Sequence, residues 1–192
     1  MLSISLPILG IVKKELKKPG TDKVLLVSTY KLEELIATKL RALYGRFKGR
    51  DLYDLDLVQE YNMDKIALRR MVLFYFYRAG QIFNYSLLMR NIKEKLKKVK
   101  FSEDLKGYLL PDVDFDIKKA TERFIHYFSF LSEQTEREES FILLAKYLLG
   151  KISSPRKISG IKDIEYPIKY LMGNIPISQE AVEVTVEDIK IP

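Results

Sequence analysis

The 192-residue chain contains no cysteine, no tryptophan and a single histidine, and these absences narrow the chemistry open to it. Without cysteine the chain forms no disulfide and no thiolate metal site, a composition that fits the cytosol. With His126 as the only histidine, we assemble no Ser-His-Asp, Cys-His or histidine-based metal site. The sequence also lacks a Walker-type phosphate loop and a dinucleotide-binding fingerprint.

Long apolar runs are missing as well. No run approaches the roughly 18 residues needed to span a bilayer. The opening MLSISLPILGIV is too short, and it lacks the basic start and the small-residue cleavage site of a signal peptide. With 47% hydrophobic and 31% charged residues the chain is typical of a globular protein. We therefore expect a cytoplasmic protein with no membrane partner.

The net charge of +7 is unevenly distributed. Residues 1–160 contain 30 Lys/Arg against 20 Asp/Glu, whereas residues 161–192 contain 3 against 6. A basic body attracts nucleic acid, nucleotides or an acidic protein. A solvated, lysine-rich surface accounts for the same charge, so charge alone leaves both interpretations open.

Periodicity predicts an α+β chain made mainly of helices. Short strands are predicted at 2–12 and 23–29, with a turn at Pro19-Gly20 between them. A mainly α-helical bundle follows, and its helix starts and ends are indicated by capping residues. The predicted helices cover 31–45, a segment from about 51, 65–79 after Asp64, 82–100, a segment from Asp116 to near Ser132, and a final helix that begins at Thr135 and Glu138 and stops at Gly150.

Residues 151–192 are predicted to be a linker and an extended tail. Val182, Val184 and Val186 alternate with polar residues, a pattern typical of a strand. The expected organisation is therefore a strand region at 1–30, a helical domain at 31–150 and a tail at 151–192 that ends in a C-terminal strand.

The most informative segment is YKLEELIATKLRALYGRFKGRDLYDLDL, from Tyr30 to Leu57. At about 100° per residue, Lys39 falls within the apolar stripe of the first helix, and Arg46 follows on the same face. Burying an ammonium without a partner is expensive, so an inward lysine needs a carboxylate, a phosphate or a path to solvent. Asp51 and Asp54, just after Arg50, are candidate partners, and together these residues predict a polar pocket.

Each of these residues also has a purely structural interpretation. Asp51 and Asp54 suit the N-cap or first turn of a helix, where carboxylates stabilise by about 0.5–2 kcal/mol. Lys39 could extend outward to solvent or form a structural bridge with Asp51.

The segment closely resembles a motif of the AbiEii/AbiGii-type nucleotidyltransferase toxins of type IV toxin–antitoxin and abortive-infection systems. The family pattern is a leucine-rich helix with A-x-K-x-x-A-L, a basic residue and then R-D-x-x-D-L. The matching positions here are Ala37, Lys39, Ala42, Leu43, Arg46, Arg50, Asp51, Asp54 and Leu55.

This resemblance implies that the N-terminal strands are the remnant of a polymerase-β-like nucleotidyltransferase sheet. It implies that Lys39 contacts the triphosphate and that Asp51 completes the catalytic site. Arg46 and Arg50 would bind phosphate or nucleic acid, and Asp54 would anchor the residues that contact the ligand. The family's substrates and partners would be Mg²⁺ with a nucleoside triphosphate, an RNA (such as tRNA) or protein acceptor, and an antitoxin.

The chain departs from the family pattern before this helix. The family's Gly-Ser/Thr and D-x-D motifs, which hold the metal-bound nucleotide, have no counterpart there beyond Gly20-Thr21. Asp112-Val113-Asp114 has the D-x-D form but follows the helical motif, and we interpret it as a loop or helix start. We therefore expect the C-terminal part of such an enzyme, which binds no metal until an N-terminal half is supplied. The alternative is a non-catalytic helical module that binds nucleic acid or an antitoxin-like protein.

Overall fold

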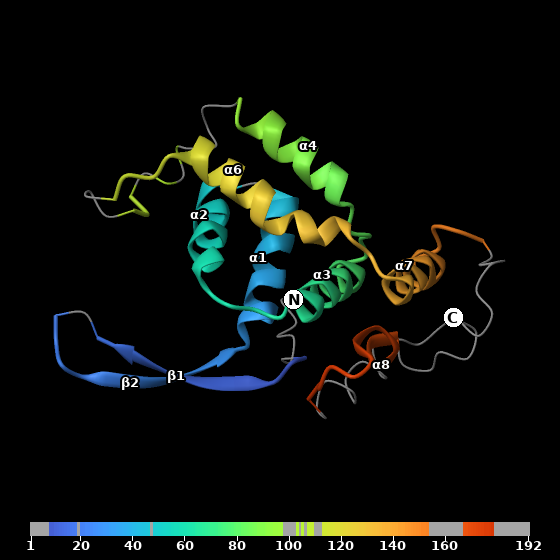
Figure 1. Cartoon of the computed structure of the whole chain (residues 1–192), viewed down its shortest axis with the longest axis horizontal. Coiled ribbons are helices and arrows are strands. Elements are labelled where there is room, and N and C mark those ends of the chain that lie inside the picture. Colours follow the sequence, from blue (N-terminus) through green and yellow to red (C-terminus); the bar gives the residue numbers. More distant parts are fainter. Residues whose placement is uncertain are drawn as a thin grey trace.

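A computed structural model describes residues 8–18, 20–46, 48–97, 103, 105, 107–109, 113–153 and 167–178, which form a helical body and a β-hairpin (Figure 1). The predicted α+β, mainly helical class is confirmed. Within these residues, no helix combines the length and the hydrophobicity required to cross a membrane. The elements are β1 (Ile11–Lys17), β2 (Val24–Tyr30), α1 (Leu32–Arg46), α2 (Gly49–Leu57), η1 (Val58–Glu60), α3 (Lys65–Arg78), α4 (Tyr85–Lys95), α6 (Ile117–Tyr127), η2 (Phe128–Ser132), α7 (Glu136–Leu148) and α8 (Pro167–Met172).

Helix α3 is the centre of the helical body. It contacts α1, α7 and α8, and every residue from Met71 to Phe76 is buried. A helix that is apolar on nearly all sides must be surrounded by other elements, which accounts for this position. Asp64 caps its start by accepting two backbone N–H hydrogen bonds of 2.9 and 3.0 Å, and Gly80, with φ of 70°, follows its end. Both boundaries were predicted from the sequence.

The hairpin differs from its prediction in the position of the first strand. Strands β1 and β2 pair antiparallel, with Ile11 opposite Tyr30. The first strand was predicted at 2–12; residues 2–7 lie outside the described residues, and β1 occupies 11–17. Ile8 and Leu9 are instead buried in the core, and their backbone N–H groups donate to the buried carboxylate of Glu34 at 2.7 and 3.0 Å. The described residues before β1 therefore anchor the chain to α1.

Two predicted helix starts are also shifted. Helix α2 begins at Gly49 rather than near Asp51. Helix α4 begins at Tyr85 rather than at residue 82, because Asn84 is its N-cap and accepts a hydrogen bond from the N–H of Leu87 at 2.8 Å. The Asp116 cap and the Thr135–Glu138 capping box are confirmed.

Helix α8 was not predicted, because α7 was expected to be the final helix. It lies within residues 151–192, and its Ile168, Leu171 and Met172 side chains are buried. Helix α8 packs on α3 and α7, where Arg70 Nη1 donates to the carbonyl of Met172 at 2.5 Å. The predicted strand at Val182–Val186 lies outside the described residues, as do Asp112 and most of the predicted linker. The division at residues 30 and 150 stays a prediction.

A buried ion pair joins α7 to α3. The Glu138 carboxylate is fully buried and accepts a hydrogen bond from Arg69 Nε at 2.7 Å. The same carboxylate accepts one from the backbone N–H of Thr135 at 2.8 Å, which completes the capping box. Because separating a buried ion pair leaves an uncompensated charge, this pair fixes how the two helices pack.

Replacing Glu138 with Gln should strongly destabilise the chain. Gln keeps the side-chain length and an acceptor for Thr135, but it leaves the buried Arg69 without an anion, which is expected to cost about 3–5 kcal/mol of unfolding free energy. Urea unfolding followed by circular dichroism measures the loss. Glu139→Gln, at an exposed position of the same helix, is the matched control. A Glu138→Gln variant as stable as this control would contradict the assignment.

Candidate functional site at the junction of α1 and α2

Helix α1 directs two cations toward the start of α2. Lys39 and Arg46 are seven residues apart, so they lie one above the other on the same side of the helix. The same side holds Ile36, Leu40 and Leu43, which are fully buried in the core. The long Lys39 and Arg46 side chains therefore start at the core and extend to its edge, where α2 begins.

Asp51 is the centre of this site. Its side chain has no solvent exposure, and it lies in the first turn of α2. Arg46 holds the carboxylate with two hydrogen bonds, from Nε to Oδ2 at 2.7 Å and from Nη2 to Oδ1 at 2.6 Å. Such a two-pronged arginine–carboxylate contact fixes both direction and distance. It therefore holds the end of α1 against the start of α2.

Lys39 bridges both aspartates. Its Nζ lies 2.5 Å from Asp54 Oδ2 and 3.9 Å from Asp51 Oδ1. The Lys39 side chain is 42% exposed and that of Asp54 is 24% exposed, so water reaches the amine. Asp54 also accepts a hydrogen bond from the hydroxyl of Tyr108 at 3.3 Å. The predicted meeting of an inward lysine with carboxylates from the next helix is present, but the amine lies at the surface of the body.

Arg50 is close in sequence but is not part of this network. It lies in the first turn of α2 and is partly exposed, with no ion pair to another described residue. The structure thus brings Lys39, Arg46, Asp51 and Asp54 together and leaves Arg50 beside them.

The helix-cap interpretation does not describe Asp51. The N-cap of α2 is Lys48, which makes no side-chain capping hydrogen bond, and both carboxylate oxygens of Asp51 bind Arg46. Because Asp51 lies in the first turn of α2, the helix dipole still stabilises its negative charge. The structural-bridge interpretation of Lys39 fits the geometry as well as a phosphate-binding role does.

The residues of this site do not fit a magnesium ion by themselves. In the described part of the chain, no group of three or more His, Cys, Asp or Glu side chains is placed to hold a metal. Asp51 and Asp54 are the carboxylates that contact Lys39, and both are neutralised by cations. Magnesium requires several oxygen ligands in octahedral geometry. Metal binding here would need further carboxylates.

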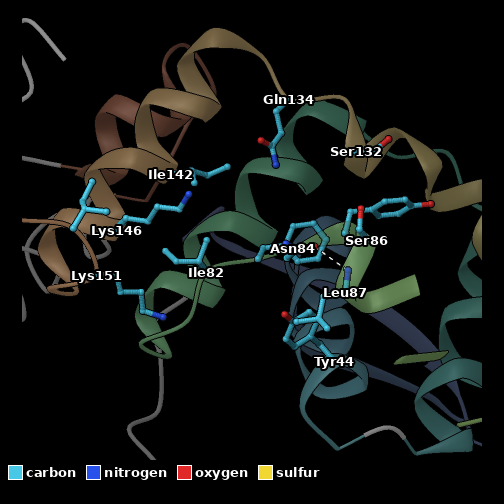
Figure 2. Close-up of a pocket in the computed structure, with 13 residues that line it drawn as sticks. Tyr44, Ile82, Asn84, Ser86, Leu87, Ser132, Gln134, Ile142, Lys146 and Lys151 are labelled. Carbon is cyan, nitrogen blue, oxygen red and sulfur yellow. Dashed lines mark hydrogen bonds between the residues drawn. The ribbon is translucent and has the colours of Figure 1, made fainter. Parts of the chain in front are cut away.

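A large open cavity lies on another side of the body, away from this cluster. It has a volume of about 770 Å³ and lies between α4 and α7, with Tyr44 of α1 at one wall (Figure 2). Tyr44 is 140° around α1 from Lys39 at about 100° per residue, so the two side chains face different neighbours. The cluster and the cavity are therefore separate features.

Two other polar contacts, one of α1 and one of α2, were not predicted from the sequence. Glu34, at the start of α1, also accepts a hydrogen bond from the Tyr75 hydroxyl at 2.5 Å. Asp56 of α2 pairs with Arg123 of α6 through two hydrogen bonds, at 2.8 and 2.5 Å. These partners are 41 and 67 residues apart in the chain, and no local pattern indicates them.

Comparison with known families gives a match to this chain. The family model described as "Nucleotidyl transferase AbiEii toxin, Type IV TA system" matches residues 5–128, more than half of the chain. The matched segment contains the hairpin, α1 to α4 and α6, and thus the whole Lys39–Asp51 cluster. Comparisons with curated proteins and with solved structures find no match.

Asp51→Asn and Asp54→Asn should differ in their effect on stability. Asp51 is fully buried and doubly bonded, so losing its charge should cost about 1.5–3 kcal/mol, whereas the exposed Lys39–Asp54 pair should be worth about 0.2–1 kcal/mol. Urea unfolding of both variants measures the difference, and each serves as the control for the other. Equal losses would show that Asp51 does not hold α1 and α2 together.

Proposed function

Because the chain belongs to the AbiEii family of nucleotidyl transferase toxins of type IV toxin–antitoxin systems, we propose that it is the C-terminal part of such an enzyme. The complete enzyme would transfer a nucleotide from a nucleoside triphosphate to an RNA, such as tRNA, or to a protein. The observation that carries this proposal is the Lys39–Asp51–Arg46 cluster, which lies within the matched segment.

Lys39 is the residue we propose to bind the triphosphate. Nucleotidyl transfer depends mainly on positioning the phosphates and neutralising their charge. The Lys39 amine is partly exposed and is held by Asp54, a carboxylate that is itself accessible to solvent. A phosphate oxygen would replace Asp54 as the partner of the amine, and Arg50 would supply a second positive charge nearby.

We propose that Asp51 and Arg46 position Lys39 rather than contact the nucleotide. The Asp51 carboxylate is completely buried, and Arg46 occupies both of its oxygens. One of those oxygens is also 3.9 Å from the Lys39 amine. Asp51 would thus set the direction of Lys39, and Asp54 would hold the amine in place until phosphate binds.

The hairpin supports the proposal that another segment or polypeptide completes the enzyme. Its second strand begins with the apolar run VLLV, a pattern typical of strands covered on both faces. Yet Val24, Leu25 and Leu26 are 57%, 51% and 62% exposed. We propose that the metal-binding part of the enzyme packs here and brings the paired carboxylates that would hold Mg²⁺. An antitoxin is the second partner that family membership suggests.

Reconstituted activity tests the proposal. The chain is mixed with Mg²⁺, each labelled nucleoside triphosphate and total RNA or protein, with and without the upstream half of an AbiEii family enzyme. We expect labelled acceptor only when that half is present, and a loss of at least about 100-fold in Lys39→Ala, as for other phosphate-neutralising groups. Arg41→Ala, an exposed cation of the same helix, is the matched control and should keep activity.

Two outcomes would contradict this account. Labelling by the chain alone that disappears in Lys39→Ala would show that the site is already complete. Reconstituted activity that is equal in the Lys39→Ala and Arg41→Ala variants would show that Lys39 has no part in transfer.

A further inference from the structure

A second cavity lies along one face of α4 and shares two lining residues with the cavity of Figure 2. The first has a volume of about 770 Å³ and the second about 430 Å³, and the side chains of Tyr85 and Ser86 line both. We call these two adjoining cavities the α4 groove.

Five cations line the α4 groove. Lys146 and Lys151 line the first cavity, across from Asn84 and Tyr44 in Figure 2, and Lys146 points into the space between them. The second cavity adds three more basic residues and a single acid: Arg90, Lys93, Lys97 and Glu94. The groove therefore carries a clear excess of positive charge along its length.

These cations have no internal partner among the described residues. Lys39, Arg46, Arg69 and Arg123 each form an ion pair with a carboxylate. The described part of the chain contains no such pair for the five cations of the groove. Their charge is thus available to an external anion, and a row of separated cations suits a chain of phosphates better than a single ion.

Two tyrosines, Tyr44 and Tyr85, line the groove beside these cations. The Tyr44 ring packs edge-on against Phe76, with ring centroids 4.8 Å apart, and is thereby fixed at the wall of the first cavity. Tyr85 lies between the two cavities. Burial raises the pKa of both phenols, so the tyrosines stay neutral and do not repel an anion. Flat aromatic faces beside cations are the features on which unpaired bases stack.

We propose that the α4 groove binds a single-stranded segment of nucleic acid, with phosphates along the lysines and bases against Tyr44 and Tyr85. A duplex would offer its phosphates but keep its bases inside, and an acidic peptide would offer charge without flat rings. Neither would use the tyrosines. The inference is independent of the proposed nucleotidyl transfer, because the groove and the Lys39 cluster share no residue.

The test is binding of a fluorescein-labelled, mixed-sequence RNA strand of about 12 nucleotides, within the ~4–16 nucleotides of known single-strand sites, measured by anisotropy over a range of salt. The triple variant Lys93→Ala, Lys146→Ala, Lys151→Ala should weaken binding at least tenfold. It should also reduce the slope of log K against log salt by about 2, at about 0.7 per lost contact. The matched control is Lys13→Ala, Lys14→Ala, Lys23→Ala in the exposed hairpin, which removes equal charge and should leave the slope unchanged.

Substitutions of Tyr85 distinguish the contribution of base stacking to RNA binding from that of charge. Tyr85→Leu should weaken binding by about fivefold or more, the lower end of one base–aromatic contact, whereas Tyr85→Phe keeps the ring and should bind like the parent. Circular dichroism shows whether each variant is folded, and the lysine variants decide the question if Tyr85→Leu is not.

Four results would overturn the inference. They are no binding at low salt, equal loss in the two lysine triple variants, equally strong competition by an RNA duplex of the same length, or equally strong competition by polyglutamate of the same charge. The last result would assign the groove to an acidic protein instead.

Discussion

The buried carboxylate of Asp51 is the interaction on which the arrangement of α1 and α2 depends. A carboxylate with no solvent exposure requires hydrogen-bond donors or cations at short range, and for Asp51 α1 supplies both Arg46 and Lys39 from one side of the helix. Arg46 satisfies both oxygens, which leaves Lys39 at the edge of the body. Charge balance inside the fold thus places a partly exposed amine at a defined position.

Two other helix starts also contain a buried acid. Glu34 in the first turn of α1 accepts hydrogen bonds from Ile8, Leu9 and Tyr75, and Glu138 in the first turn of α7 binds Arg69. In each case a buried acid near a helix N-terminus is satisfied by groups distant in the chain. These acids join the N-terminal segment, α1, α3 and α7 into one helical body.

The sequence predicted what depends on near neighbours. The position of Lys39 within the apolar stripe predicted its contact with Asp51 and Asp54, and the caps at Asp64, Asp116 and Thr135 predicted three helix starts. Helix capping and the spacing of apolar residues along a helix depend on residues within one or two turns, so they can be predicted from the sequence.

Features set by distant residues could not be predicted. The partners Arg69 and Glu138 are 69 residues apart, and α8 is a six-residue helix stabilised by burial against α3 and α7 rather than by its own length. The α4 groove combines residues of α1, α4 and α7 with those that follow α7. Arg90, Lys93 and Lys97 are close together in the sequence, but neither the tyrosines nor Lys146 and Lys151 could be placed beside them from the sequence.

The structure separates two kinds of positive charge. At the junction of α1 and α2 the cations are paired with carboxylates and held in fixed positions, as the proposed contact of Lys39 with a triphosphate requires. In the α4 groove they lack such pairs within the described residues and follow a concave surface, as binding an extended anion requires. One helical body would thus offer a precise site and an adaptable one.

The central claim is that the Lys39 amine exchanges Asp54 for phosphate. The most direct measurement is an NMR titration with ATP. The lysines of the chain carry isotopically labelled methyl groups, and the Lys39 resonance is assigned by its absence in the Lys39→Ala variant. We predict a saturable shift of that resonance, and tighter binding in Asp54→Asn, because the competing carboxylate has lost its charge. A Lys39 resonance that stays still while the lysines of the α4 groove respond would contradict the account.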